Sequence, residues 1–412
     1  MINRIFILTI SLLFCFRVTA QSIYNWIEQL NHMGMRHTQV FSNDTSMVIM
    51  TEAAQWRGPV NGIDIILQEV AAFTDKNRSV NIVMLDHGVP RVNIKVSEYN
   101  NRLFSEGLID FSQLVSNVSL DITEPVKKIK STTNYKKHYF GLTTLTLYPM
   151  ILLDNYTFDV LYHYQFSLAP TLQTDLWRGG YVTLQYIVPI YGNKLEKDDE
   201  YHVRPGFITF TQEGRIGKYT TFQWSTGVFN QQRWGSDLKF DHYLTTINTT
   251  IGANIGYTGK CITYGKEKNL SSLKTVTGDI HINSYFPTIH SQTKLKITRF
   301  LSGSMGIRGD FTRHFGERSI GGYILLSDNQ PNFGFYFAIP LNPKRYLSKG
   351  KFSIRLADYF DWCYSWLSFA RYPNYGKFYE TQPDENSSAH YWEPKFIKSS
   401  LQNMTDGIKH YY

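Results

Sequence analysis

The sequence predicts a mainly β fold, with a transmembrane antiparallel β-barrel of about twelve strands preceded by a small α/β domain. Three observations predict it. The first twenty residues have the pattern of an export signal, the later part of the chain alternates apolar and polar residues, and no run of eighteen apolar residues follows the signal. Aromatic residues make up 15% of the 412 residues and charged residues 18%, a composition that disfavours a disordered chain.

Residues 1–20 are expected to be a signal peptide that is cleaved on export. Arg4 supplies the positive charge, residues 5–16 form the apolar core, and Val18-Thr19-Ala20 supplies small residues before the cleavage site. An apolar core of about twelve residues is too short to span a hydrocarbon layer of ~30 Å. Cys15 does not follow a small residue, which disfavours a lipoprotein. We therefore expect export without a membrane anchor.

Residues 21–97 are predicted to form a small αβ domain in the periplasm. Helical spacing of apolar residues predicts a first helix over 23–32, and a stripe that starts at Ile63 predicts a second helix. The order α-β-β-α-β-β gives a compact unit with a modest core. Residues 98–135 are predicted to be a linker. The predicted strands are 38–41, 46–51, 81–85 and 92–96.

Residues 136–371 are predicted to form the barrel because their apolar and polar residues alternate with period two. Leu295 and Ile297, for example, alternate with Lys294 and Lys296. Several such runs reach about nine to eleven residues, the length that crosses a membrane at a tilt. Aromatic residues gather at the ends of the runs, as they do at membrane interfaces. A secreted β-sandwich produces the same alternation and is the alternative fold.

The tail, residues 372–412, is polar and alternates poorly. We expect it to be an extension that lies against the barrel or in the periplasm. Two cysteines, Cys261 and Cys363, remain after removal of the signal. They are far apart in the sequence, which leaves open whether they form a disulfide.

The sequence lacks the motifs of enzymes and metal sites, which predicts a protein without catalytic residues, cofactor or metal. There is no nucleophile elbow, no His-Glu-x-x-His, no P-loop and no dinucleotide fingerprint. The acidic run at 196–200 is interpreted as a surface loop rather than a Ca²⁺ site. Asp358 and Asp361 would lie on opposite faces of a strand, so they do not form a hydrolase pair. A net charge of +8 without Lys/Arg blocks predicts no nucleic-acid partner.

The polar face of the alternating region holds the candidate ligand-binding residues. If this face lines a lumen, the lumen has mixed charge and is slightly basic, which suits a hydrophilic and acidic polymer such as a polysaccharide. The alternative is that these side chains pair with one another and close a narrow barrel. The candidates are Lys294, Lys296, Arg308, Arg355, Asp279, His281, Asn283 and Asp310.

Several short motifs resemble the YjbH-like exopolysaccharide biosynthesis outer-membrane protein family. Thr312-Arg313-His314-Phe315-Gly316-Glu317 and Ile339-Pro340-Leu341-Asn342-Pro343 are similar to its barrel motifs. Trp56-Arg57 before a helix and the turn His87-Gly88-Val89-Pro90 are similar to parts of its small domain. The resemblance implies an outer-membrane barrel with small periplasmic αβ domains and no catalytic residues. Fuller members of the family carry two barrels, and this chain has room for one.

The resemblance leads to the main functional hypothesis. In this hypothesis the protein is a non-catalytic barrel in the outer membrane of a Gram-negative bacterium, and it assists secretion or assembly of an exopolysaccharide or capsule. The expected partners are outer-membrane lipid, the polysaccharide and periplasmic export components. Two alternatives remain: a secreted β-sandwich that acts on or binds carbohydrate, and an outer-membrane channel for small solutes.

Overall fold

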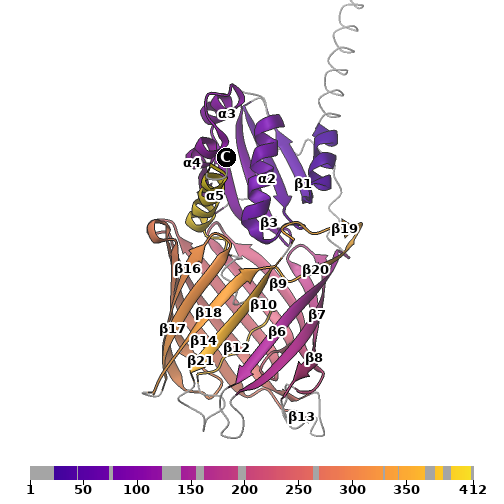
Figure 1. Ribbon diagram of the computed structural model, residues 1–412, viewed down its shortest axis with the longest axis vertical. Coiled ribbons are helices and arrows are strands. Elements are labelled where there is room, and N and C mark those ends of the chain that lie inside the picture. The colour runs from indigo at the N-terminus through magenta and orange to yellow at the C-terminus, as the bar shows by residue number, and fades with distance from the viewer. Residues whose placement is uncertain are drawn as a thin grey trace, which may run out of the picture.

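The computed structural model of the chain is mainly β and contains two sheets (Figure 1). A small sheet with helices packed against it forms an α/β region, and a large curved sheet lies below it in the view (Figure 1). The predicted signal peptide and the acidic run at 196–200 lie outside the residues that the structure describes. Those residues are 23–43, 45–73, 78–122, 141–154, 162–193, 201–262, 269–327, 330–341, 343–366, 376–383 and 391–409.

The α/β region is built on a five-stranded sheet. In order across the sheet, its strands are β1 (Arg36–Ser42), β2 (Ser46–Glu52), β3 (Ser79–Asp86), β4 (Val89–Val96) and β5 (Ser119–Asp121). β2 and β3 pair in parallel and are connected by α2 (Gly58–Phe73), whereas the other neighbours pair antiparallel. Residues 23–32 form the first helix. The predicted α-β-β-α-β-β order is confirmed.

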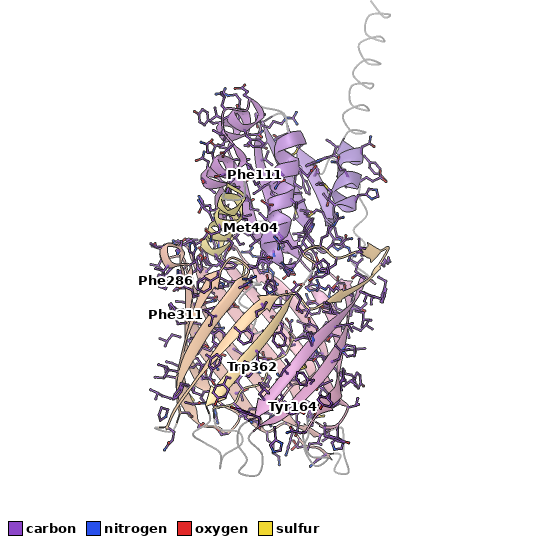
Figure 2. The ribbon with its side chains drawn as sticks, viewed as in Figure 1. Phe111, Tyr164, Phe286, Phe311, Trp362 and Met404 are labelled. Carbon is purple, nitrogen blue, oxygen red and sulfur yellow. The ribbon has the colours of Figure 1, made fainter. Side chains whose placement is uncertain are left out.

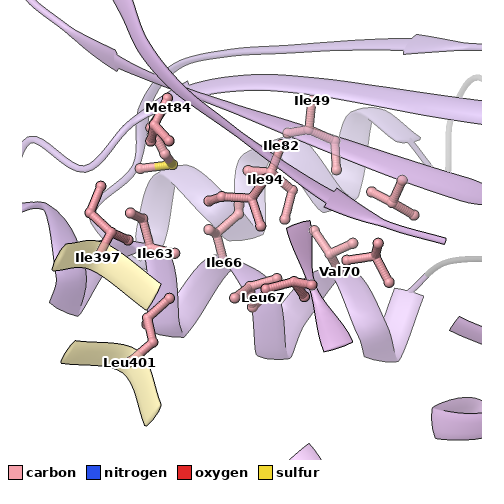
Figure 3. Packing of buried hydrophobic residues seen from close by; sticks show 14 of the residues in the cluster. Ile49, Ile63, Ile66, Leu67, Val70, Ile82, Met84, Ile94, Ile397 and Leu401 are labelled. Atoms are coloured by element: carbon pink, nitrogen blue, oxygen red, sulfur yellow. The ribbon is translucent and has the colours of Figure 1, made fainter. Parts of the chain in front are cut away.

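The core of the α/β region lies between α2 and the sheet (Figure 3). The apolar stripe predicted for this helix is buried there, with Ile63, Ile66, Leu67 and Val70 at most 2% exposed. Strand residues such as Ile82 pack against the stripe. Because burial of a side chain of this size contributes about 1.5–3 kcal/mol, the stripe is a main source of stability for the region.

The stretch 98–122, expected to be part of the linker, belongs to the α/β region instead. It forms α3 (Glu98–Ser105), α4 (Phe111–Asn117) and β5. Leu114 and Val115 of α4 are buried in the core. The linker prediction is therefore wrong for these residues, and residues 123–135 lie outside the described part of the chain.

Capping side chains explain why two such short helices form. Asn100 donates its backbone N–H to the Ser97 side chain at the start of α3. Asp110 and Gln113 form a reciprocal capping box at the start of α4. Seven or eight residues are too few for a clear 3.6-residue period, so the sequence pattern did not distinguish these helices from a linker.

The large sheet has sixteen strands, more than the about twelve predicted. Consecutive long strands pair antiparallel, and short turns such as the one at Gly316 and Glu317 leave room for more strands than expected. The strands are β6 (Thr143–Asp154), β7 (His163–Trp177), β8 (Gly180–Gly192), β9 (Arg204–Ile216), β10 (Thr220–Phe229), β11 (Arg233–Leu244), β12 (Thr249–Ile262), β13 (Asn269–Leu270), β14 (Thr275–Phe286), β15 (Ser291–Arg299), β16 (Met305–Phe315), β17 (Arg318–Ser327), β18 (Gln330–Pro340), β19 (Ser348–Lys349), β20 (Phe352–Leu356) and β21 (Tyr359–Trp366).

The two edges of the large sheet meet at a seam. β20 pairs in parallel with the start of β6, and β21, which begins three residues after β20 ends, pairs antiparallel with β18. β21 also contacts β6 (Figure 1), but within the described residues no hydrogen-bonded ladder joins these two strands. The sheet therefore curves until its edges touch, and the described ladders do not form a closed barrel.

The predicted alternation places apolar side chains on the outer face of the curved sheet and polar side chains on its inner face. On β15, Leu295 and Ile297 are 50% and 53% exposed, whereas Thr298 is 4% exposed. Figure 2 shows side chains along the outer face, with Phe286 near the α/β region and Tyr164 near the opposite end. Among the described helices, none has the length and hydropathy of a membrane span.

The C-terminal tail lies in part against the large sheet, which agrees with one of the two expected locations, and it also packs into the α/β core, which was not expected. Residues 376–383 lie along the inner face of the large sheet and form hydrogen bonds with it. Further on, α5 (Pro394–Lys409) packs into the α/β core through Phe396, Ile397 and Leu401. The tail therefore contacts both regions. Its inner part bonds to the large sheet, and its helix supplies apolar residues that complete the α/β core.

Candidate functional site in the interior of the large sheet

Strands β14, β15 and β16 bring most of the predicted ligand-binding residues together on the inner face. Strand pairing places Asn283 opposite Lys294 and His281 opposite Lys296, and β16 continues both rows. We call this group the inner cluster. It consists of Asp279, His281, Asn283, Lys294, Lys296, Arg308 and Asp310, and the eighth candidate, Arg355, lies outside it.

His281 is held between two carboxylates of the inner face. Its Nδ1 lies 2.7 Å from Asp279 Oδ1, and its Nε2 lies 2.9 Å from Asp241 Oδ1. Lys239 Nζ is 3.7 Å from Asp241 Oδ2. Gly252 makes room for the imidazole, because a Cβ at this position would overlap the ring. The side chain is 4% exposed, so His281 is a fixed part of the wall.

Arg308 and Asp310 also satisfy each other. Arg308 Nη2 donates to Asp310 Oδ1 at 2.7 Å, and its Nε lies 3.0 Å from both carboxylate oxygens. The guanidinium carbon lies 4.0 Å from the centre of the Tyr323 ring, a cation–π contact. The sequence left open that the polar residues of this face pair with one another. Arg308 with Asp310, and His281 with its two carboxylates, fit that alternative.

Lys294 and Lys296 are the remaining cations of the inner cluster. Neither forms an ion pair or hydrogen bond with any residue in the described part of the chain. Asn283 Oδ1 accepts a hydrogen bond from Gln292 Nε2 at 3.0 Å. The two ammonium groups are therefore the inner-cluster groups best suited to contact an anionic ligand.

Arg355 belongs to the seam. Its Nη1 lies 3.6 Å from Asp358 Oδ1, and its Nε donates to Thr146 Oγ1 at 3.3 Å. Asp358 is buried and also accepts a hydrogen bond from the Tyr346 hydroxyl at 2.8 Å, whereas Asp361 is exposed. The two aspartates therefore have different environments. Arg355 is not part of the inner cluster but links β20 to β6 at the seam.

Residues 376–383, here called the inner segment, occupy part of the interior. The Tyr379 hydroxyl donates to Asp237 Oδ2 at 2.6 Å, and its ring stacks on Phe229 with centroids 5.2 Å apart. Gly256 provides the space for this hydroxyl, because a Cβ there would overlap it. Tyr379 is therefore seated in a shaped socket on the wall.

Two further contacts hold the inner segment. Gln223 Nε2 donates to Thr381 Oγ1 at 3.3 Å, and the Gln382 amide donates to the Tyr181 hydroxyl. These partners lie 158 and 201 residues earlier in the chain. Sequence reasoning missed the inner segment because its pattern is irregular and its partners are so distant. A glycine in mid-strand, such as Gly256, was the available signal of a close approach.

The turn between β3 and β4 enters the rim of the large sheet. His87 Nδ1 lies 2.8 Å from Asp175 Oδ1, its ring stacks on Tyr181 at 4.2 Å, and Gly179 donates its N–H to the His87 carbonyl at 2.7 Å. Burial alone would lower the pKa of His87, but the Asp175 carboxylate raises it to about 10. The protonated His87 side chain therefore docks the turn against the large sheet through its ion pair with Asp175.

Arg91 extends this junction. Its guanidinium contacts Asp86 Oδ2 at 3.0 Å and also bonds to Glu213, which accepts from the Tyr181 hydroxyl at 2.9 Å. Behind the turn, Glu52 Oε2 accepts the N–H of Gly88 at 3.0 Å. Burial raises the pKa of the Glu52 carboxyl to about 7. Tyr181 thus contacts the turn, the sheet wall and the inner segment.

A second junction joins the start of α2 to the β16–β17 turn. Arg57 Nη2 lies 2.6 Å from Glu317 Oε2, and Asn61 Nδ2 donates to Glu317 Oε1 at 2.7 Å. Arg57 also donates to the carbonyl of Leu341. A cavity of about 100 Å³ beside them is lined by these turns and by α5. The motifs that carry the family resemblance therefore lie at the two junctions between the sheets.

Comparison of the chain with protein-family models and with curated proteins finds no match. The site geometry and the short motifs are therefore the basis for a functional proposal.

Proposed function

We propose that the chain is an outer-membrane protein that assists secretion or assembly of an extracellular polysaccharide without catalysing a reaction. In this proposal the large sheet is a transmembrane antiparallel β-barrel and the α/β region lies in the periplasm. The observation that supports it most is the apolar outer face of the curved sheet. The expected signal peptide supports export.

The outer face is better suited to lipid than to water. Ile297, Ile307 and Ile324 on the three neighbouring strands β15, β16 and β17 are 53%, 50% and 64% exposed. A soluble β-sandwich would bury such a face against a second sheet, and large exposed apolar surfaces mark membrane or protein contacts. A hydrocarbon layer removes each of these side chains from water, a gain of about 1.5–3 kcal/mol for a fully buried one. The sandwich alternative is therefore disfavoured.

In a lipid environment the backbone N–H and C=O groups at the sheet edges must also have hydrogen-bond partners. A strand edge inside a bilayer leaves unpaired N–H and C=O groups, each costing several kcal/mol, so a spanning sheet must close. β20 and β21 are consecutive in the chain and pair with β6 and β18, the strands on either side of the seam. We propose that the barrel closes at this seam, where β20 and β21 together act as the last strand and run parallel to β6.

The polysaccharide part of the proposal rests on the family resemblance and on the inner cluster. Lys294 and Lys296 present two ammonium groups that form no direct ion pair or hydrogen bond within the described residues, and Asn283 lies opposite Lys294 on the neighbouring strand. Such groups suit the carboxylates or phosphates of an acidic polymer. An open solute channel is less well supported, because the inner segment occupies part of the interior.

Cell fractionation and gel mobility test the membrane location. We expect the protein in the outer-membrane fraction, with a band that migrates faster when the sample is not boiled, as folded barrels do. Recovery of the protein as a water-soluble periplasmic or secreted species would refute the location and the barrel together.

Neutralising the two lysines tests the polymer contact. Changing Lys294→Gln with Lys296→Gln is expected to lower surface polysaccharide several-fold while the heat-dependent band is retained, because the charge is lost and the wall pairs remain. The matched control is Lys260→Gln with Lys274→Gln, which removes the same charge from exposed positions. Equal polymer in both double variants would contradict the role of the inner cluster.

A further inference from the structure

The inner segment and α5 belong to one stretch of chain that contacts both sheets. We propose that this stretch is a built-in plug, in which the inner segment blocks the interior of the barrel and leaves it only when α5 is released from the α/β region. This inference goes beyond the role in polysaccharide export. It rests on the proposed membrane location alone.

The contact between the inner segment and the wall excludes water. Tyr379 and Thr381 are each 2% exposed, although both are polar and lie on a polar wall. Their hydroxyls have partners, Asp237 and Gln223, so burial leaves neither unsatisfied. The stacked Phe229 ring adds an apolar contact at the same place. These features describe a fitted segment rather than a loose tail.

The other end of the stretch is built into the α/β core. Ile397 and Leu401 are fully buried there, among the residues of α2 and the small sheet (Figure 3). α5 also touches the rim of the large sheet, because the Phe396 and Tyr285 rings meet with centroids 5.3 Å apart. Ser399 Oγ lies 2.8 Å from His290 Nδ1 at the same rim. Removal of α5 therefore opens both the core and the rim contact.

The covalent connection couples the two ends. Eight peptide steps separate Pro383 at the end of the inner segment from Tyr391 before α5, and they span at most ~29 Å. A larger displacement of α5 must therefore pull on the inner segment. Gln382 also contacts Tyr181, which stacks on His87 of the docking turn, so the same residue contacts both the inner segment and the turn.

Single-channel recording in planar bilayers tests the plug. The wild-type protein is expected to conduct rarely, because Tyr379 is seated. Gly256→Ala places a methyl group in the socket and is expected to raise the fraction of time in a conducting state at least about tenfold, equivalent to ~1.4 kcal/mol. Gly309→Ala is the matched control, because its Cβ meets one side-chain atom at 3.8 Å. Tyr379→Phe, which removes the bond to Asp237, serves if Gly256→Ala fails to fold.

A crosslink tests the coupling to α5. Gln402 Nε2 on α5 lies 3.5 Å from Ser116 Oγ on α4, so cysteines introduced by Ser116→Cys and Gln402→Cys are close enough to be joined by a short, reducible bifunctional thiol crosslinker. Cys261 and Cys363 are both free, so the disulfide that the sequence left open is not formed, and both are first replaced by serine. Joining the pair in the Tyr379→Phe variant is expected to abolish the added conductance, and reduction is expected to restore it.

The outcomes separate the two proposals. A variant with the heat-dependent band and wild-type conductance overturns the plug while leaving the membrane location intact. Conductance that persists in the crosslinked protein overturns the coupling to α5. Wild-type protein that conducts continuously as an open pore also overturns the plug. Absence of the heat-dependent band in the wild type refutes the proposed location itself.

Discussion

At the scale of the residue, Arg57 shows how one buried cation joins two parts of the chain. Its side chain is 2% exposed, and the carboxylate of Glu317 is 23% exposed. Removing one partner of a buried pair leaves the other charge without compensation, which costs more than the pair contributes. Glu317 occupies the position near the start of α2 where an anion is favoured.

Arg57→Ala is predicted to destabilise the protein by about 3 kcal/mol, because the Glu317 carboxylate and the Leu341 carbonyl lose their guanidinium partner. The control is Lys344→Ala. Lys344 approaches the same carboxylate at 3.9 Å but is 57% exposed, so its loss is expected to cost below ~1 kcal/mol. Urea unfolding in detergent micelles, followed by tryptophan fluorescence, measures both. Similar midpoints for the two variants would show that Arg57 does not hold the junction.

At the scale of the element, α5 is the clearest case in which tertiary structure decides the fold of a segment. The tail is polar overall, yet Phe396, Ile397 and Leu401 recur at helical spacing and fill the last side of the α/β core. The helix is therefore stabilised by a core whose other residues lie mostly between Trp26 and Val118.

Leu401→Ala is predicted to lower the free energy of unfolding of the α/β region by about 2–5 kcal/mol, because it leaves a cavity at a fully buried position. Asn403→Ala, on the exposed side of α5, is expected to change it by less than ~0.5 kcal/mol. Hydrogen exchange of α2 and β3 reports the opening of this core. Equal exchange in the two variants would mean that α5 is dispensable for it.

The elements that were predicted correctly are those with a local pattern. Leu295 and Lys296 alternate, and Ile63 and Ile66 recur at helical spacing, so the sequence indicates which face of each element is apolar. The inner cluster could be found for the same reason, since His281 and Lys296 lie on neighbouring alternating strands. α4, the inner segment and the pairing of β20 with β6 depend on distant partners, which no local period reveals.

At the scale of the whole molecule, two junctions and the stretch from the inner segment to α5 join the sheets, and the junction at the β3–β4 turn contains His87, whose charge changes between neutral and alkaline pH. His87 is docked against Asp175, and its pKa is raised from 6.5 to about 10. A group whose pKa is raised on folding stabilises the docked state fully below pH 6.5, and that contribution is lost as the pH rises through about 10. Docking of the α/β region is therefore predicted to weaken from neutral to alkaline pH.

Hydrogen exchange of the peptide over 86–91, corrected for intrinsic rates between pH 6.5 and 9.5, measures this docking. We expect protection in the wild type to fall by of order 1 kcal/mol per pH unit over part of this range. His87→Gln keeps a polar side chain but cannot carry the charge, so its protection should be lower at pH 6.5 and should fall less with pH than that of the wild type, with Glu52 behind the turn as a remaining titrating group. His32→Gln, at an exposed position, should behave as the wild type. A wild-type profile that is flat, or that rises with pH, would show that the charge on His87 does not hold the two sheets together.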